Sequence, residues 1–291
     1  MRAETAAAPA DIAPPVPAPP VPDDATASGL TPETLATYRR AMTTLREAEV
    51  PFLVGGAYAF GRYTGIIRHT KDFDVFVRPA DLAPALEALA GAGFRTEVPF
   101  PHWLGKAHAG DDFIDVIFSS GNGLARVDDQ WFENAVEGEV LGEQALLCPA
   151  EEMLWSKAFI MERERFDGGD VAHLLLARAR ELDWRRLLSR FAGHEPVLLS
   201  HLLLFDYIYP GETGAPREVI DELLVRTRAA TPPVERLCRG PILSRGQYLA
   251  DIEERGYRDA RLAPLGAMGP DEVAIWTRAA REEEQKNIDQ H

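Results

Sequence analysis

Hydrophobic and polar positions alternate along the chain in a pattern that changes near residue 149. Before that point, short apolar runs alternate with longer stretches in which apolar residues recur at helical spacing. Thr31 and Pro32 suit the start of a helix running toward Glu49, because threonine caps helices and proline is tolerated in the first turn. The sequence also predicts a helix over 82–92, a short helix opened by Asp128 or Asp129, and strands or extended segments at 52–54, 72–77, 94–98, 103–107, 113–118, 139–141 and 145–147.

After Pro149 the pattern becomes helical. A strong helix is expected from Pro149 through Met161. A chain of 291 residues is expected to form about two domains, because domains commonly contain roughly 150 residues. We therefore predict a first domain over 30–148 and a mainly α-helical C-terminal domain over 149–291. Its further helices are expected at 172–180, 184–191, 196–209, 219–224, 247–255 and 271–284.

Residues 1–29 have a different composition. They are rich in alanine and proline and are predicted to be a disordered tail, because such a segment cannot form a packed core. The tail lacks the continuous apolar segment of a secretory signal, and no apolar run in the chain reaches the roughly 20 residues that span a bilayer. Cys148 and Cys238 form neither a disulfide framework nor a zinc site of recognisable spacing. We expect a cytoplasmic protein with no membrane partner.

The net charge narrows the range of partners. It is −15 at pH 7, with a pI near 4.9. Nonspecific nucleic-acid binding depends on neutralising phosphates with lysine and arginine, so it is not expected here, although a local basic groove remains compatible with this charge.

Candidate chemistry begins in the segment from Phe52 to Asp74. An apolar run leads into Gly55 and Gly56, then a helix-like stretch, then a strand that carries Asp72 and Asp74. Residues i and i+2 of a strand lie on one face, roughly 6.6 Å apart, so the two carboxylates project together. Magnesium prefers one or two carboxylates together with substrate phosphates. The glycines allow close approach of the backbone to a ligand, and the helix start that follows favours an anion.

A third acid, Asp115, lies within the apolar run from Phe113 to Phe118. An acid in a buried strand is costly unless it is paired or bound to a metal. If this strand lies next to the strand of Asp72 and Asp74, the three carboxylates converge. Asp115 can then bind a metal and accept a proton from an attacking hydroxyl.

The order of these residues resembles the nucleotidyltransferase superfamily, which includes polymerase β, aminoglycoside nucleotidyltransferases and AbiEii-type toxins. The resemblance runs from about Leu30 to Leu175 and rests on Gly55-Gly56, on the run from Thr70 to Val75, and on Asp115. It implies an α/β (α+β) fold with a mixed sheet flanked by helices. It also implies two Mg²⁺ ions and transfer of a nucleoside monophosphate from an NTP with release of pyrophosphate. Family members often have Gly-Ser where this chain has Gly-Gly, as AbiEii-like members do, so the acceptor stays open.

The helix after Pro149 carries a second resemblance. The run from Pro149 to Lys157, followed by Arg163, Arg165, Asp167 and Asp170, is similar to a helix and charged segment of AbiEii-like nucleotidyltransferases. The match implies that Lys157 approaches the triphosphate and that a following acid orders the site; His173 stands where relatives often have another acid. The alternative is a solvated ionic face formed by Glu152, Arg163, Glu164 and Asp170.

Several other residues have two interpretations. Trp103 can stack on a base and Lys106 can contact phosphate, but an ordinary strand with one aromatic anchor explains both, and we favour it. His194 and His201 are interpreted as structural. Arg245, with Arg239, can face an acidic substrate, or the segment can be a turn followed by a helix that Ser244 caps.

The predicted function is NMP transfer from an NTP to an unidentified hydroxyl. Gly55, Gly56, Thr70 and Lys157 are the candidate nucleotide-binding residues. Asp72, Asp74 and Asp115 are the candidate catalytic and metal-binding residues. Two alternatives stay open: an inactive relative that binds a nucleotide or a partner protein, and a toxin-like enzyme that modifies tRNA or protein. The acceptor can thus be a small molecule, tRNA or protein.

Overall fold

A seven-stranded mixed sheet organises the protein. The computed structural model describes residues 29–68, 70–231 and 235–289, so the predicted tail over 1–29, apart from Gly29, lies outside the described residues. The strand order is β3-β4-β5-β2-β1-β7-β6, with β2 parallel to β5, β1 parallel to β7, and the other neighbours antiparallel. The strands are β1 (Leu53–Val54), β2 (Asp72–Phe76), β3 (Arg95–Phe100), β4 (Leu104–Ala109), β5 (Asp112–Ile117), β6 (Val136–Val140) and β7 (Glu143–Leu147).

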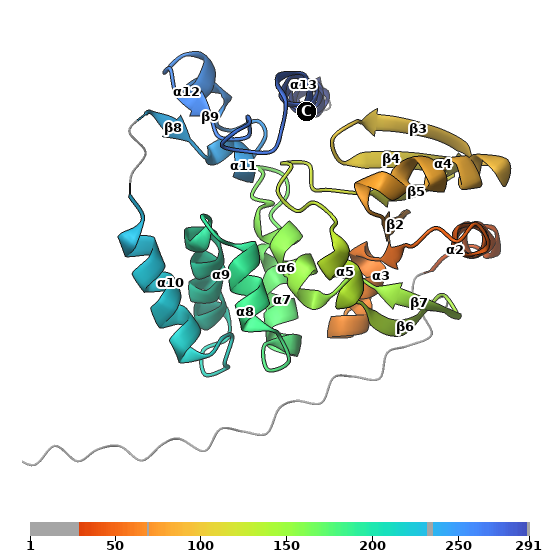
Figure 1. The fold of residues 1–291 in the computed structure, drawn as a ribbon, viewed down its shortest axis with the longest axis horizontal. Coiled ribbons are helices and arrows are strands. Elements are labelled where there is room, and N and C mark those ends of the chain that lie inside the picture. Colours follow the sequence, from red (N-terminus) through yellow and green to blue (C-terminus); the bar gives the residue numbers. More distant parts are fainter. Residues whose placement is uncertain (1–28, 69, 232–234, 290–291) are drawn as a thin grey trace, which may run out of the picture.

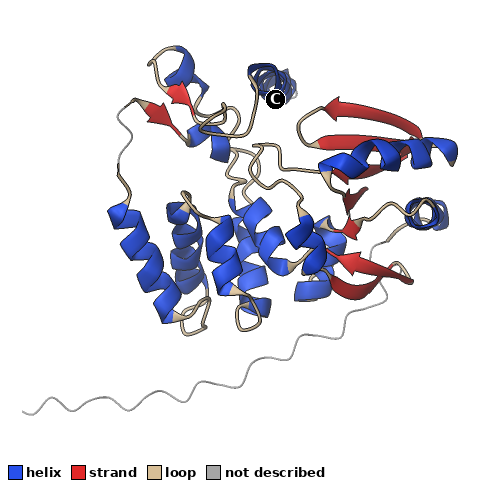
Figure 2. Ribbon diagram, viewed as in Figure 1, coloured by secondary structure: helices blue, strands red, loops and turns tan. Residues whose placement is uncertain are grey.

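Helices cover the sheet and then continue away from it (Figure 1, Figure 2). The long helix over 32–47 begins as predicted, with Thr31 accepting a hydrogen bond from the backbone N–H of Thr34. The helices are α2 (Pro32–Glu47), α3 (Gly56–Thr64), α4 (Leu82–Gly91), α5 (Asp129–Glu133), α6 (Ala150–Ala158), α7 (Gly168–Arg178), α8 (Trp184–Arg190), α9 (Glu195–Ile208), α10 (Arg217–Ala229), α11 (Gly240–Leu243), α12 (Leu249–Glu253) and α13 (Pro270–Asp289), with a short 3-10 turn at Pro79–Asp81.

The two faces of the central strands have different roles. Phe73, Val75, Ile114 and Val116 are fully buried. Tyr38 of α2 stacks on Phe73 with ring centroids 4.9 Å apart, so this face packs against the N-terminal helix. The alternate residues of the same strands point to the opposite face, because side chains alternate along a strand. That opposite face carries the acids.

The helix of Lys157 is shorter than predicted. It ends at Ala158 instead of continuing through Met161. The Met161 N–H donates to the carbonyl of Leu243 at 3.0 Å, and the Glu162 N–H donates to the carbonyl of Arg165 at 2.8 Å. The chain therefore leaves the helix to make a tight reverse turn. This turn places Arg165 and Asp167 beside Lys157.

The solvated ionic face considered for this region is wrong for two of its four residues. Arg163 and Glu164 are exposed, but Glu152 and Asp170 are buried. Arg186 and Arg190 of α8 pair with Glu152 at 3.0 and 3.2 Å. These ion pairs tie α6 to α8. Removing one partner of a buried pair is costly because it leaves an uncompensated charge.

The end of the chain returns to the sheet. The parallel strands β8 (Leu237–Cys238) and β9 (Arg258–Asp259), which the sequence did not predict, precede α13. Helix α13 packs against β3, the far strand of the seven-stranded sheet, as Figure 1 shows. Among the described residues, no helix has the length and apolar character needed to cross a membrane.

His201 provides a pH-dependent contribution to stability. Its side chain is buried, its Nε2 lies 2.8 Å from the carbonyl of Ala158, and burial lowers the pKa of the imidazole below its usual value of 6.5. Because the unfolded chain then binds the proton more readily, the free energy of unfolding is expected to fall as pH drops below about 6.5. His201→Gln keeps a donor for Ala158 and should flatten that slope in denaturant titrations between pH 5 and 8. An unchanged slope would contradict this.

Candidate active site

The three acids predicted from the sequence lie on neighbouring strands. As expected, β5 lies next to β2, and the two are parallel, with Asp74 paired in register with Asp115. Register partners on adjacent strands are about 4.8 Å apart between backbones. Asp72, Asp74 and Asp115 all line one cavity of about 790 Å³. The sheet thus brings together acids that are more than 40 residues apart in the chain.

Crowding and burial change the acidity of these carboxyls. Burial, followed by the charges of Asp115 and Asp72, raises the pKa of Asp74 from its ordinary value of 3.8 to about 7. Burial also raises the pKa of Asp115, against the opposing effect of a hydrogen bond from Lys106. Both shifts have burial as their largest cause, and the neighbouring carboxylates add to it by disfavouring further negative charge.

The glycine pair packs closely against β2. The Gly55 N–H donates to the carbonyl of Asp74 at 3.1 Å, and Gly56 starts α3 with φ of 55°. A Cβ on Gly56 would lie 1.7 Å from Asp74 Oδ2, and a Cβ on Gly55 would lie 2.2 Å from the ring of Phe76. No other residue type fits at either position without displacing a neighbour. Gly56 also lines the cavity.

Lys157 lines the same cavity. Its Nζ donates to Asp167 Oδ2 at 3.1 Å and to Asp170 Oδ2 at 2.7 Å. Arg165 makes a bidentate interaction with Asp167, in which Nε donates to Oδ1 and Nη2 donates to Oδ2, both at 2.9 Å. The charges of Lys157 and Arg165 both act on Asp74, so the cations face the acidic strands.

The acids beside Lys157 stay ionised. Burial alone would raise the pKa of Asp167 and of Asp170. Hydrogen bonds from Arg165 to Asp167 and from Arg68 to Asp170, together with the charge of Lys157, lower both pKa values below the usual one. The order of these residues in the sequence identified Lys157 and the two acids. Arg68 was not identified, since nothing in its local sequence indicates that it pairs with Asp170.

Thr70 has an indirect position. Its Oγ1 accepts a hydrogen bond from the Asp72 N–H at 3.0 Å, which fixes the start of β2. Within the described part of the chain, Thr70 and Gly55 lie outside the cavity lining, whereas the other predicted site residues belong to it. Thr70 therefore orients Asp72 without facing the cavity.

Lys106 has a closer relation to the acids than the sequence suggested. It pairs in register with Asp115 across β4 and β5, and its Nζ lies 2.6 Å from Asp115 Oδ1. The ammonium also lies 4.1 Å from the centre of the Phe113 ring. The ordinary-strand interpretation favoured for Lys106 therefore missed a half-buried ion pair. Strand register alone could have revealed it.

The donor set suits a hard divalent cation. Among the residues that the structure describes, no group of three or more His, Cys, Asp or Glu side chains is arranged to hold a metal ion. Asp115 is engaged by Lys106, which leaves Asp72 and Asp74 as the available carboxylates. Magnesium needs only one or two carboxylates beside substrate phosphates. Gly56 leaves room for the Asp74 carboxylate, since a Cβ at that position would lie 1.7 Å from Asp74 Oδ2.

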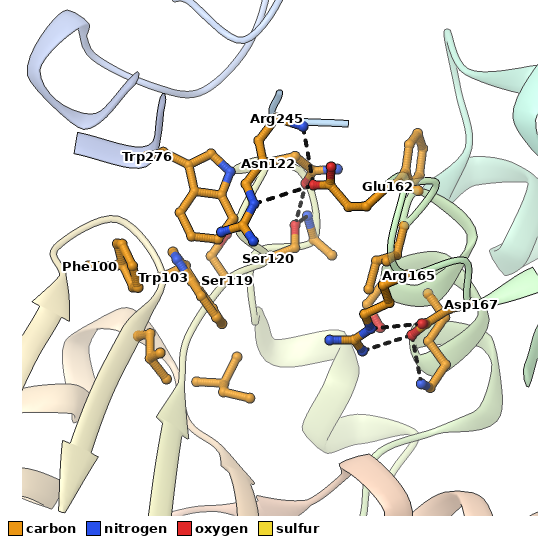
Figure 3. Close-up of a pocket in the computed structure, with 18 of the residues that line it drawn as sticks. Phe100, Trp103, Ser119, Ser120, Asn122, Glu162, Arg165, Asp167, Arg245 and Trp276 are labelled. Carbon is orange, nitrogen blue, oxygen red and sulfur yellow. Dashed lines mark hydrogen bonds and ion pairs between the residues drawn. The ribbon is translucent and has the colours of Figure 1, made fainter. Parts of the chain in front are cut away.

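The cavity extends beyond the predicted residues (Figure 3). Phe100, Trp103 and Trp276 form one side, while Arg245 and Glu162 lie above the loop that carries Ser119, Ser120 and Asn122. Residues 241–247 and α13 contribute to this lining. Arg245 was considered for an acidic substrate, but the contribution of the other residues in 241–247 and of α13 was not predicted, because these segments are more than 120 residues from the acidic strands.

Comparison with known proteins gives structural likeness only. No protein-family model matches the chain, and no curated protein matches it. The antibiotic-resistance factor ANT(2'')-Ia, also solved in complex with adenylyl-2''-tobramycin, is similar over 59% of this chain and 96% of its own, with 14% identity and a TM-score of 0.44.

Two further solved structures are similar. The lincosamide antibiotic adenylyltransferase LnuA shares 15% identity over 50% of this chain and 96% of its own, with a TM-score of 0.35. An antigenic nucleotidyltransferase-like protein from Paracoccidioides brasiliensis shares 14% identity over 59% of this chain and 93% of its own, with a TM-score of 0.34.

Lys157 is expected to be required for nucleotide binding. Lys157→Met keeps the aliphatic stem but removes the ammonium that faces the acidic strands, so the Kd for Mg-ATP should rise about 10- to 100-fold, as for loss of a hydrogen bond to a charged group. Calorimetric titration measures this. Lys71→Met, at an exposed position beside Asp72, removes the same charge and serves as the matched control. Equal Kd values for the two variants would contradict a phosphate-binding role.

Proposed function

We propose that the protein is a nucleotidyltransferase that moves a nucleoside monophosphate from an NTP to an acceptor hydroxyl. One observation carries the proposal: Asp74 and Asp115 are register partners on parallel strands, Gly56 packs closely against Asp74, and Lys157 lines the same cavity. Membership of the nucleotidyltransferase superfamily, and of its AbiEii-like branch, is part of this proposal and is supported by the Gly-Gly pair and the order of the acids.

The residues have separate roles in the proposal. The start of α3 at Gly56 directs backbone N–H groups toward the triphosphate, and Lys157 approaches it within the same cavity. Gly55 acts indirectly, because its N–H donates to the carbonyl of Asp74. Asp72 and Asp74, with Asp115 as a further ligand, would hold Mg²⁺. Mg²⁺ bound there would neutralise phosphate charge and fix the α-phosphate for in-line attack. The resemblance implies two Mg²⁺ ions. Binding of both ions by these three acids would require Asp115 to release its ion pair with Lys106 and bind metal instead.

The transfer itself has a simple atomic balance. The acceptor oxygen forms a bond to the α-phosphorus, while the bond from that phosphorus to the bridging oxygen breaks and pyrophosphate leaves. The acceptor proton passes to Asp115. The chain contributes mainly positioning and charge neutralisation.

Turnover of labelled nucleotides tests the proposal. Purified protein with Mg²⁺ and α-labelled ATP, CTP, GTP or UTP is incubated with cell extract, beside the Asp72→Asn/Asp74→Asn variant. Label should appear on a macromolecule or metabolite only when both acids are intact, which also identifies the acceptor class. Absence of transfer together with absence of Mg-dependent nucleotide binding would overturn it.

A second candidate is a binding protein of the same fold. It is favoured by the ion pair of Lys106 with Asp115, which occupies the proposed proton acceptor. Such a protein would bind Mg-NTP without transferring label. A toxin-like enzyme acting on tRNA or protein shares the chemistry, and its label would appear on a macromolecule.

We also propose a domain boundary near 148/149. It is supported by the end of β7 at Leu147 and the start of α6 at Ala150. The cavity then lies between the sheet and segments from the C-terminal part.

A further inference from the structure

The floor of the cavity changes character along one strand. Asp115, Ile117 and Ser119 all line it, as expected for alternate residues at the end of β5. At about 3.3 Å per residue, the four steps from Asp115 to Ser119 cover roughly 13 Å. The cavity therefore runs from a charged end at the acids, past apolar side chains, to a second end near Ser119.

Three aromatic rings form a wall at the second end (Figure 3). Phe100, the last residue of β3, stacks on Trp103 with ring centroids 5.7 Å apart. Trp276 of α13 meets Phe100 edge-on at 4.9 Å and Trp103 at 5.5 Å. A Cβ on Gly121 would lie 2.4 Å from the ring of Trp276, so this glycine makes room for it. The rings line the cavity and are only partly buried.

Among the residues that the structure describes, one polar atom of the wall has no hydrogen-bond partner. This atom is the buried Nε1 of Trp103. A buried indole N–H usually finds a partner. The loop beside it is fixed, because Ser120 Oγ donates to Asn122 Oδ1 at 2.6 Å and Asn122 Nδ2 donates to the carbonyl of Ile242 at 2.9 Å. The loop that borders this end of the cavity is therefore held in place beside the aromatic wall.

The charged side chains Glu162 and Arg245 neutralise each other at this end of the cavity. Glu162 accepts hydrogen bonds from Ser244 Oγ at 2.7 Å and from the Arg245 N–H at 3.1 Å. The Arg245 guanidinium lies 3.6 Å from Glu162 and 4.7 Å from the centre of the Trp276 ring. This pairing gives neither the basic groove that a nucleic acid requires nor an acidic pocket for a polycation.

We propose that this end binds the acceptor, a small molecule whose planar ring system stacks on the wall of Phe100, Trp103 and Trp276 and whose hydroxyl reaches Asp115. The inference rests on the proposed function. Partly desolvated aromatic walls bind rings by stacking and apolar contact. Given the length of the cavity floor, the ring and the reacting hydroxyl lie on the order of 10 Å apart.

The nucleobase of the NTP has the same ring chemistry, so the experiment must separate the two sources. The probe is 4-methylumbelliferyl glucoside, which joins a planar ring to sugar hydroxyls, with methyl glucoside as the ringless control. Calorimetric Kd values are measured on the full chain, first alone and then with saturating Mg²⁺ and α,β-methylene-ATP. Mg-ATP and inorganic tripolyphosphate are titrated separately to measure the contribution of the base.

Two variants change the wall by different amounts. Trp276→Leu should weaken the ring probe about tenfold, the scale of one lost stacking contact, and Trp103→Phe should weaken it less, since a smaller aromatic ring remains at that position. The Kd of Mg-ATP should stay within about twofold in both variants. Trp184→Phe, on α8, is the matched control, because its indole N–H donates to Ala179 at 3.0 Å outside the cavity.

The outcomes separate the possibilities. Loss of Mg-ATP affinity in Trp276→Leu with unchanged tripolyphosphate affinity would assign the wall to the nucleobase and overturn the inference. Failure of the wild-type chain to prefer the ring probe over methyl glucoside would also overturn it. Unchanged binding of the ring probe in both variants, with folding checked by circular dichroism, would mean that the three rings only pack the protein interior and do not bind the acceptor. The probe is also titrated without nucleotide, so its binding is measured independently of NTP turnover. Loss of probe binding with intact NTP turnover would contradict only this inference, and probe binding without NTP turnover would contradict only the proposed function.

Discussion

Asp74→Asn is expected to lower nucleotidyl transfer by at least about 100-fold, the effect typical of losing one preorganised electrostatic group in an active site. Asp74 is the acid nearest to Gly56, and it is the one whose pKa is raised to about 7 by burial and by its acidic neighbours. An amide oxygen carries no negative charge, so it is a weaker ligand than a carboxylate for Mg²⁺, which is usually held by one or two carboxylates. Initial rates with α-labelled NTP and the identified acceptor measure the loss.

The same variant should not lose stability. In metal-free buffer the raised pKa means that the folded wild-type chain binds a proton more tightly than the unfolded chain, so its free energy of unfolding falls as pH rises from about 4 to about 7. Asp74→Asn should flatten that slope and should be at least as stable as wild type at pH 8.

Asp112→Asn is the matched control for activity. Asp112 lies on β5 outside the cavity lining and accepts a hydrogen bond from Thr34 Oγ1 at 2.9 Å. Transfer by this variant should stay within about twofold of wild type, as expected for a surface substitution away from the site. Full activity of Asp74→Asn, or a loss explained by unfolding, would exclude the proposed role of Asp74.

Gly56→Ala is expected to lower transfer by a comparable factor, about 100-fold, because it displaces the Asp74 carboxylate. The new Cβ would lie 1.7 Å from Asp74 Oδ2, so the acid must move. The left-handed backbone, with φ of 55°, adds a cost of about 1–2 kcal/mol for a residue with a Cβ. Denaturant titration measures the stability loss, and initial rates measure the activity loss.

Gly91→Ala is the control that separates the clash with Asp74 from the general effect of replacing a glycine by alanine. Gly91 closes α4, and a Cβ there would meet nothing within 4 Å. Replacing a helical glycine by alanine is neutral or stabilises by up to about 1 kcal/mol. If Gly56→Ala behaved like Gly91→Ala in both measurements, the close approach of Gly56 to Asp74 would have no functional role.

Much of the fold could be predicted because its signals are local. The start of α2 follows from Thr31 and Pro32, since capping depends on adjacent residues. The convergence of the three acids was conditional on the adjacency of their strands, and the structure shows that β5 lies next to β2. The end of α6 was predicted wrongly because the bond from Met161 to Leu243 depends on a segment 82 residues away.

The sequence by itself determined the chemical types at the charged end of the cavity: two acids on one strand face, a third on an apolar strand, a glycine pair and a lysine. These follow from residue identity and the two-residue period of a strand. Only the tertiary structure decided the partners of these residues. The register between β4 and β5 set Lys106 against Asp115, and the packing of α13 against β3 brought Trp276 to Phe100. Such contacts depend on how distant elements pack, and no local pattern in the chain records them.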